Sequence, residues 1–266
     1  MNQSKRWKIS NWVGPLFTGL VYGFLYLPIS ILVMFSFNDS TMTYKWRGFT
    51  LDWYYELFQS SEIWTVLKNS LIVASASVIL SLVMGCFLVW GLSRKFKSIL
   101  PLFYITVMIP DVVVAVGLLS FFTLIFVPLG LTTLVAGHTL IGLGFVVPII
   151  YNRFMEIDQR LIEASLDLGA TYWQTFFKIV LPLLKPALIA SGLLVFIMSL
   201  DDFLIAFFCA SADSQTLSLY IFSMVRAGLS PLVNALSTFL LLISALFVWL
   251  FSIILKKREA GVVQHD

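Results

Sequence analysis

Long apolar runs alternate with short polar connections along this chain. The runs lie near residues 14–37, 66–92, 99–127, 131–152, 186–210 and 233–255. The hydrocarbon core of a bilayer is about 30 Å thick, which about 20 consecutive apolar residues cross as a helix. We therefore predict an all-α, polytopic membrane protein with six transmembrane helices. We expect residues 1–266 to form a single transmembrane domain, with an N-terminal helix at about 14–37 and a core of five helices at about 66–255.

The composition excludes a soluble globular protein. Hydrophobic residues make up 59% of the 266 residues and charged residues only 12%, about half of the charged fraction in soluble domains. A soluble fold of this length has no means of covering so much apolar surface. The solvent around most of the chain is therefore lipid.

Basic residues gather on one side of the predicted spans. The two termini and the second and fourth connections carry 13 of the 17 lysines and arginines: Lys5, Arg6, Lys8, Arg94, Lys95, Lys97, Arg153, Arg160, Lys178, Lys185, Lys256, Lys257 and Arg258. Cytoplasmic connections are the ones enriched in Lys and Arg. We therefore expect both termini to lie in the cytoplasm.

The long charged stretch at about 153–185 separates the fourth and fifth predicted spans. Asp158 favours a helix N-cap, and Gly169 stands where a helix end requires a positive φ, which glycine adopts at little cost. The helix between them carries one stripe of small and apolar residues, namely Leu161, Ala164, Ser165 and Leu168. We predict a short helix with a face that another protein can approach closely.

A second short helix is predicted to follow. Thr171 favours its N-cap, and Pro182 ends it after Leu181, because proline cannot continue the helical hydrogen bonds. Pro186 then stands at a permitted first-turn position of the fifth span. Residues 156–182 are therefore expected to form a cytoplasmic helix-turn-helix, which we call the elbow.

Ionisable residues occur inside three of the predicted spans. Asp111 follows Pro110 in the third, His138 lies in the fourth, and Asp201 and Asp202 lie in the fifth. At a rise of about 1.5 Å per residue, Asp111 is about 18 Å and Asp201 about 22 Å from the cytoplasmic ends of their spans. His138 reaches a similar depth, which favours a shared polar lumen.

Three interpretations of these residues remain open. No Lys or Arg stands between Lys97 and Arg153 or between Lys185 and Arg226, so His138 is the basic candidate for pairing. In the first, the acids are structural polar contacts that are protonated or paired with His138. In the second, they line a path for a cationic substrate. In the third, they form the proton relay of a secondary transporter. We favour the path for a cation.

The first outer connection, about 38–65, is long and aromatic. Leu51, Tyr54, Tyr55 and Phe58 recur at helical spacing, which predicts a short helix in the headgroup layer. Such a helix anchors the chain at the interface. A second interpretation adds a docking surface for an extracytoplasmic partner.

The elbow carries the residues of a known motif. Its pattern is Glu163-Ala164, then Gly169, then after nine residues Ile179, Leu181 and Pro182. This pattern resembles the cytoplasmic EAA loop of the permeases of binding-protein-dependent ABC importers. Ser165 stands where that family usually has a second alanine, a change between small side chains. The resemblance implies a type I ABC importer permease fold, in which these seven residues belong to a coupling helix that inserts into a groove of the ATPase subunit.

Further stretches resemble the spermidine/putrescine permease subunits of this family. They are Ser36-Phe37-Asn38, Gly48-Phe49-Thr50 with Trp53-Tyr54, Pro110-Asp111, Ser199-Leu200-Asp201-Asp202 and Val233-Asn234-Ala235-Leu236. Leu232 departs from the pattern, since an acidic residue is expected there. Together with the intramembrane acids, the resemblance implies a polyamine importer in which Asp111, Asp201, Asp202 and His138 line the translocation path.

The resemblance also implies partners and a location. A second homologous permease subunit completes the pore, two ATPase subunits bind the elbows, and an extracytoplasmic substrate-binding protein delivers the substrate. Membrane lipid surrounds the assembly, and no nucleic acid takes part. The chain has no G-x-x-x-x-G-K-[ST] phosphate loop, so we expect no cofactor here and assign ATP use to the partner ATPase subunits. The expected location is the bacterial cytoplasmic (inner) membrane.

Two alternatives remain. An ABC importer for a different small solute fits the elbow equally well, because a fold does not determine a substrate. A proton-coupled secondary transporter accounts for the intramembrane acids but leaves the elbow unexplained. The sequence contains no metal-ligand cluster or nucleophile–base pair, so we predict that this chain is not an enzyme.

Overall fold

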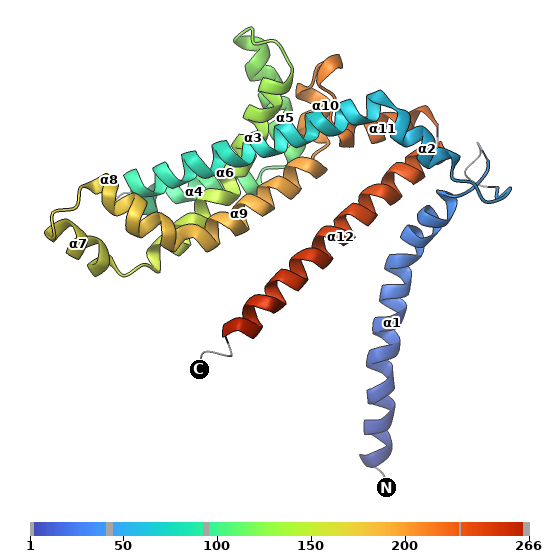
Figure 1. The fold of residues 1–266 in the computed structure, drawn as a ribbon, viewed down its shortest axis with the longest axis horizontal. Coiled ribbons are helices and arrows are strands. Elements are labelled where there is room, and N and C mark those ends of the chain that lie inside the picture. The colour runs from blue at the N-terminus through green and yellow to red at the C-terminus, as the bar shows by residue number, and fades with distance from the viewer. Residues whose placement is uncertain (1–2, 41–44, 93–95, 229, 263–266) are drawn as a thin grey trace. The chain divides into compact units, whose positions relative to one another are not determined.

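The computed structural model describes residues 3–40, 45–92, 96–228 and 230–262 (Figure 1). Within these ranges the side chains at 3–13, 96–97, 247–248 and 250–262 are not described. Many basic residues that carry the predicted orientation therefore lie outside the described residues or side chains: Lys5, Arg6, Lys8, Arg94, Lys95, Lys97, Lys256, Lys257 and Arg258.

The described residues form helices and turns, with one isolated bridge between Asn38 and Phe49 and no strand. In chain order the elements are α1 (Gln3–Phe35), α2 (Asp52–Gln59), α3 (Ser61–Gly91), α4 (Phe96–Met108), α5 (Asp111–Leu124), α6 (Leu131–Met155), α7 (Gln159–Asp167), α8 (Tyr172–Thr175), the π-helical turn η1 (Phe176–Val180), α9 (Leu181–Asp201), α10 (Leu204–Cys209), the 3₁₀ turn η2 (Ala212–Ser214), α11 (Leu217–Ala227) and α12 (Pro231–Val262). The predicted all-α fold class is confirmed.

The chain divides into two compact units. One comprises residues 1–60 with 223–266, and the other comprises residues 61–222. In the first unit, α2 confirms the short helix predicted in the outer connection. Its Trp53 indole donates a hydrogen bond to the carbonyl of Asn38 at 2.9 Å, and the Tyr54 hydroxyl shares one with Ser36 at 2.7 Å. These contacts fix α2 against the end of α1.

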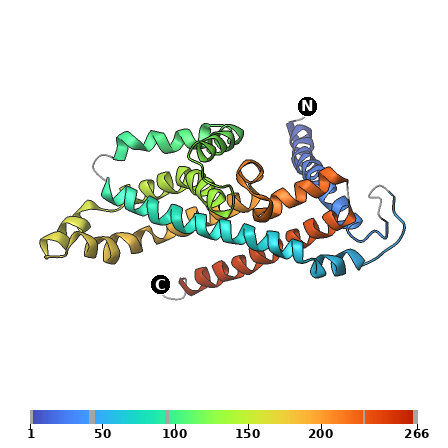
Figure 2. The ribbon, with the colours of Figure 1, turned by 90° about the horizontal axis from the view of Figure 1, so that it is seen from above.

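In the second unit α3, α6 and α9 pack along one another (Figures 1 and 2). The Ser81 hydroxyl of α3 donates to the carbonyl of Thr139 in α6 at 3.3 Å. A Cβ atom added at Gly142 would lie 2.5 Å from that hydroxyl and 3.0 Å from Val195 Cγ1, so a larger residue there forces a neighbouring side chain or helix to shift. Glycine and serine at a helix contact are typical of membrane proteins, where close backbone packing replaces the hydrophobic drive.

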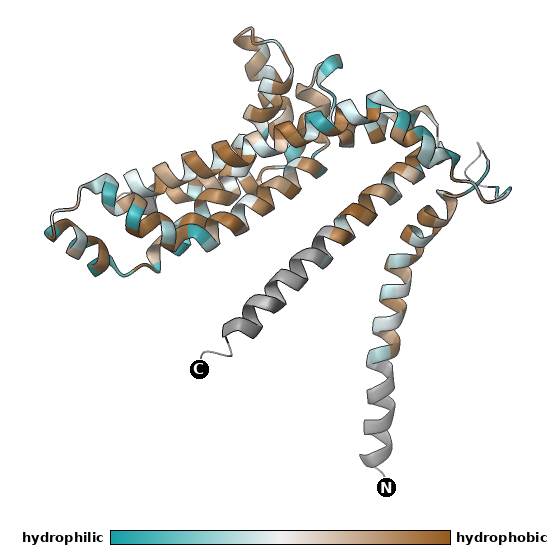
Figure 3. Ribbon diagram, viewed as in Figure 1, coloured by the Kyte–Doolittle hydropathy of each residue, from teal (hydrophilic) through white to brown (hydrophobic). Residues whose placement is uncertain are grey.

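Four helical segments of the described chain are long and apolar enough to cross a membrane. They are 14–35 of α1, all of α3, all of α6, and the continuous segment 172–201. In Figure 3 apolar colouring runs along α3 and α9, while polar residues gather at α7 and α8. A fifth span results if α4 and α5 count as one, and the apolar part 231–246 of α12 is shorter. The predicted number of six spans therefore stays a prediction.

The predicted third span, 99–127, is wrong as a single helix. The helices at 98–108 and 111–124 meet at a bend of 102°. Pro110 lies at this break with an extended backbone, φ −56° and ψ 132°. Proline lacks the amide hydrogen and disfavours helical geometry in the residue before it, and this is why the helix ends before Pro110 and begins again at Asp111.

The predicted fifth span, 186–210, is also wrong in its limits. The helix that begins at Thr171 does not end at Pro182; it continues through η1 into α9, and Pro186 lies inside α9 rather than opening the span. A proline ring clashes with the carbonyl four residues earlier, and the wider π-helical turn just before Pro182 relieves this crowding. The span instead ends at Asp201, and α10 is a separate short helix.

Candidate functional site

The four intramembrane residues singled out from the sequence line one cavity of about 290 Å³ in the second unit. Asp111 is the first residue of α5, Asp201 is the last residue of α9, and Asp202 follows it directly. His138 lies on α6. The carboxylates therefore stand at two helix breaks rather than in the middle of continuous spans, and most of the remaining lining is apolar.

His138 is buried between two polar partners. Its Nδ1 shares a hydrogen bond with the Ser199 hydroxyl at 2.5 Å. Its Nε2 lies 3.4 Å from Asp202 Oδ2 without hydrogen-bond geometry. The pairing of His138 with one of the acids, expected because no Lys or Arg is nearby in sequence, is thus present and involves Asp202.

Asp202 also holds the helix break together. Its Oδ2 accepts a hydrogen bond from the amide of Ala206 in α10 at 3.2 Å, and its main-chain carbonyl accepts one from the Ser218 hydroxyl at 2.5 Å. The Asp202 side chain is only 16% exposed. Ser199 and Ser218 were missed as polar partners; Ser199 was detectable, because it stands three residues before Asp202 within the predicted fifth span.

Asp111 and Asp201, in contrast, are exposed to the cavity. Among the described residues no Lys or Arg lines this cavity. The C-terminal end of α9 contributes a partial negative charge beside Asp201, and the N-terminal end of α5 contributes a partial positive charge beside Asp111. The ionisable side chains that line the cavity are therefore three carboxylates and the imidazole of His138.

The first helix of the elbow has the predicted ends. The Asp158 carboxylate accepts a hydrogen bond from the Arg160 amide at 3.0 Å, which confirms the N-cap. Gly169 has φ +87°. The amide of Gly169 donates to the carbonyl of Leu166 at 2.9 Å, and that of Ala170 to Ser165 at 3.0 Å, which is the Schellman arrangement that ends a helix.

The second helix of the elbow begins as predicted. The Thr171 hydroxyl accepts a hydrogen bond from the Gln174 amide at 3.2 Å, and the Gln174 side chain accepts one from the Thr171 amide at 2.8 Å. This reciprocal capping box satisfies two amides at the start of α8.

The seven motif residues divide into an outer and an inner set. Glu163, Ala164, Gly169 and Pro182 are exposed, whereas Ile179 and Leu181 are partly buried. Ser165 is only 7% exposed. Of the predicted stripe, Leu161 and Leu168 are exposed at 51% and 89%. Ser165 therefore faces the interior of the elbow, and its neighbours Glu163 and Ala164 face outward.

A model of one protein family matches most of the chain. The family is described as binding-protein-dependent transport system inner membrane component, and its model matches residues 77–259. The matched segment includes the cavity and the whole elbow.

Two curated relatives from Escherichia coli (strain K12) are similar over most of their length. The spermidine/putrescine transport system permease protein PotC is 35% identical over 249 residues, covering 92% of this chain and 94% of the relative. The putrescine transport system permease protein PotI is 34% identical over 233 residues, covering 84% of this chain and 83% of the relative.

Two crystal structures share the fold. A bacterial ABC transporter involved in the import of the acidic polysaccharide alginate has a TM-score of 0.73 at 17% identity, covering 97% of this chain and 98% of that chain. The bacterial alginate ABC transporter in complex with an alginate pentasaccharide-bound periplasmic protein has a TM-score of 0.69 at 19% identity, covering 94% and 96%. At these identities the likeness concerns the fold alone.

Proposed function

This chain belongs to the family of inner-membrane components of binding-protein-dependent transport systems, and on that premise we propose that it is a permease subunit that carries polyamines in an ATP-driven ABC importer. The observation that carries the choice of substrate is the acidic cavity, in which Asp111, Asp201 and Asp202 meet without a lining Lys or Arg among the described residues. Polyamines are flexible polycations, and the relatives PotC and PotI are named for transporting them.

The acids have different roles in this proposal. Asp111 and Asp201 are exposed in the cavity, so they attract the ammonium groups of a passing polyamine. Asp202 is held by His138 and by the amide of Ala206, so it shapes the cavity and contributes its charge from the wall. Several weak attractions suit transport, because a tight site would retain the substrate.

The elbow is the proposed contact with the ATPase. The exposed residues Glu163, Ala164, Gly169 and Pro182 face the partner, while Ser165, Ile179 and Leu181 hold their positions from inside. ATP is bound and hydrolysed by two ATPase subunits, and their closure pulls the elbows together and opens the cavity outward by rigid-body movement.

The remaining partners complete the importer. A second, homologous permease supplies the other half of the pore, and an extracytoplasmic binding protein delivers the substrate; the complex of the alginate transporter with a periplasmic protein supports this kind of assembly. Both termini and the elbow lie on the cytoplasmic side of the bacterial inner membrane, as the distribution of basic residues indicates.

The test measures uptake of labelled putrescine and spermidine by proteoliposomes that contain the whole importer and its binding protein. We expect ATP-dependent, saturable uptake, and we expect Asp201→Asn and Asp111→Asn each to raise the KM about tenfold or more, since interactions with a charged group contribute about 1.5–3 kcal/mol. Asp213→Asn is the matched control, because Asp213 is exposed and does not line the cavity.

Two outcomes would contradict the proposal in different ways. ATP hydrolysis that responds to the binding protein without uptake of either polyamine would leave an ABC permease for another solute. Uptake without ATP that stops on addition of a protonophore would instead favour a proton relay through His138 and Asp202.

A further inference from the structure

The C-terminal end of α3 is tied to the elbow by one tyrosine. The last carbonyls of a helix have no partner within it, and Trp90 stands one residue before the end of α3 at Gly91. The Tyr172 hydroxyl of α8 donates a hydrogen bond to the Trp90 carbonyl at 2.9 Å. The two rings also stack, with centroids 4.2 Å apart and planes 28° apart.

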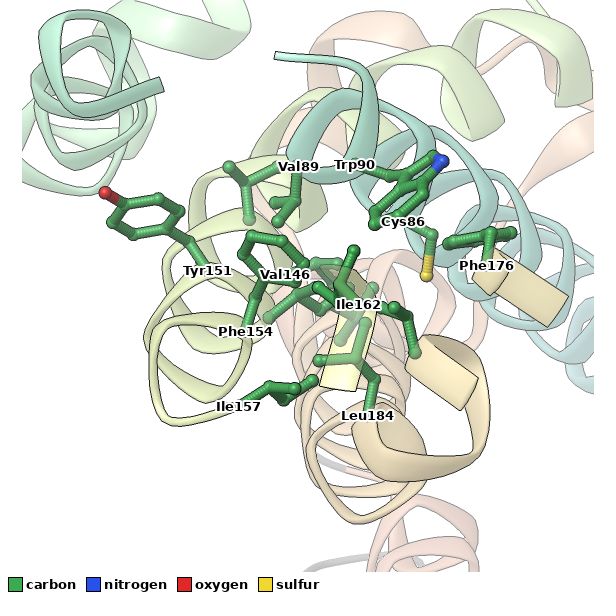
Figure 4. Packing of buried hydrophobic residues seen from close by; sticks show 14 residues of the cluster. Cys86, Val89, Trp90, Val146, Tyr151, Phe154, Ile157, Ile162, Phe176 and Leu184 are labelled. Carbon is green, nitrogen blue, oxygen red and sulfur yellow. The ribbon is translucent and has the colours of Figure 1, made fainter. Parts of the chain in front are cut away.

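Buried aromatic and aliphatic side chains pack around Trp90, which is 3% exposed, whereas Tyr172 is 45% exposed. Phe176 of η1 is 2% exposed, and its ring centroid lies 5.5 Å from that of Trp90. Phe154 of α6 meets Trp90 edge to face at 6.1 Å. Figure 4 shows Ile162 of α7 in the same cluster, together with side chains from α6, η1 and α9. Close packing of this kind deforms little under load.

The two helices of the elbow are fastened to each other. The hydroxyls of Ser165 in α7 and Thr175 in α8 share a hydrogen bond at 2.8 Å, and both side chains are buried. The Ser165 hydroxyl also donates to the carbonyl of Ile162 at 2.8 Å. A force applied to the exposed face of α7 is therefore passed to α8, whose first residue is Tyr172.

From α3 the contact continues to the cavity. The Ser77 hydroxyl donates to the carbonyl of Val135 at 3.2 Å, and the Ser81 hydroxyl donates to that of Thr139 at 3.3 Å. These two bonds to α6 lie on either side of His138, which lines the cavity. A movement of α3 is thus communicated to the part of α6 that carries this residue.

We infer that Tyr172 is a positioning residue that locks the elbow to the end of α3, so that displacement of the elbow by the ATPase reaches the cavity wall. This inference rests on the proposed function and deepens it. It assigns a role in coupling ATP hydrolysis to transport to a residue outside the seven motif positions. It also identifies α3 as the helix to which the displacement of the elbow is passed.

The test compares Tyr172→Phe with the wild type in proteoliposomes that contain the whole importer. The substitution keeps the stacked ring and removes the hydroxyl. We expect the number of polyamine molecules imported per ATP hydrolysed to fall by a factor of about 2 to 10, the range that a neutral hydrogen bond contributes. The amount of assembled complex and the rate of ATP hydrolysis stay within twofold of wild type, and Tyr172→Leu, which also removes the ring, shows a larger fall.

Tyr104→Phe on α4 is the matched control, because Tyr104 is 44% exposed and Tyr172 45%, whereas only the Tyr172 hydroxyl, of these two, bonds to the Trp90 carbonyl. We expect it to keep the wild-type ratio. If Tyr172→Phe lowers the melting temperature or the yield of the complex but leaves the ratio unchanged, the residue is merely structural and the inference is overturned.

A second readout does not depend on the substrate. Met198 lines the cavity, and the native thiols of Cys86 and Cys209 are buried at 6% and 0% exposure, so Met198→Cys reports accessibility to a water-soluble methanethiosulfonate reagent. We expect ATP with vanadate to change its labelling rate, and Tyr172→Phe to abolish most of that change. An equal change in both backgrounds, or no change in either, refutes the inference. If polyamines are not taken up but the labelling change still depends on Tyr172, the proposed polyamine substrate is refuted and the role of Tyr172 is supported.

Discussion

Gly169 offers the sharpest test of the elbow, because within this chain the cost of replacing it falls on the backbone. The residue has φ +87°, and a Cβ atom added there meets no heavy atom within 4 Å. Its amide and that of Ala170 close the end of α7 by hydrogen bonds to Leu166 and Ser165. Gly169→Ala therefore introduces strain without a steric clash.

The magnitude follows from the left-handed conformation. The left-handed conformation costs a residue with a Cβ about 1–2 kcal/mol. This cost lowers the equilibrium constant for forming the native end of α7 about 5- to 30-fold. Asparagine tolerates this conformation better than alanine, so Gly169→Asn should cost less. Aspartate adds a negative charge at the C-terminal end of α7, which the helix dipole disfavours, and we expect Gly169→Asp to uncouple transport while the protein remains in the membrane.

The assay is ATP-dependent uptake by the reconstituted importer, together with the amount of protein in the membrane. Uptake should decrease in the order wild type, Gly169→Asn, Gly169→Ala. Gly117→Ala is the control, because Gly117 also has open space around its Cβ position but lies in α5 without a positive φ. If Gly169→Ala transports like the wild type, or if asparagine is as poor as alanine, the argument from backbone strain is refuted.

Three further substitutions test the packing around the elbow and the cavity. Ser165→Ala removes the buried hydrogen bond to Thr175 and should cost about 1 kcal/mol, measured as a lower melting temperature of the purified importer. Gly142→Ala should cost about 1–3 kcal/mol, because its Cβ would lie 2.5 Å from the Ser81 hydroxyl; a melting temperature equal to that of Gly117→Ala would contradict the close helix contact. Asp202→Ala leaves the Ala206 amide and His138 without their partner. It should therefore lower the melting temperature more than Asp201→Ala does, by the equivalent of about 1–3 kcal/mol. Equal effects of the two substitutions would refute the different roles assigned to Asp201 and Asp202.

The elbow shows how far local sequence rules reach. The caps at Asp158, Gly169 and Thr171 were predictable, because each depends on atoms only two to five residues apart. The end of the second helix was not. A proline such as Pro182 normally ends a helix, but here the helix continues through the π-helical turn into α9. The spacing of apolar residues does not predict a π-helical turn.

The motif likewise did not predict which of its side chains are buried and which are exposed. Ser165 occupies a position that the motif assigns to a small residue, yet its hydroxyl is buried against Thr175. Tyr172 and Trp90 are 82 residues apart in the chain, so their contact has no signal in a single sequence.

The sequence by itself determined the solvent, the fold class, the family motif and the identity of the ionisable residues within the apolar spans. Composition and hydrophobic run length report on burial in lipid, and capping patterns report on neighbours along the chain. The tertiary structure decided that α5 begins at Asp111 and α9 ends at Asp201, and that these two breaks meet His138 around one cavity. A proline permits a helix break without specifying its angle, and only the packing of α5 against α10 and of α9 against α6 places these carboxylates around one cavity.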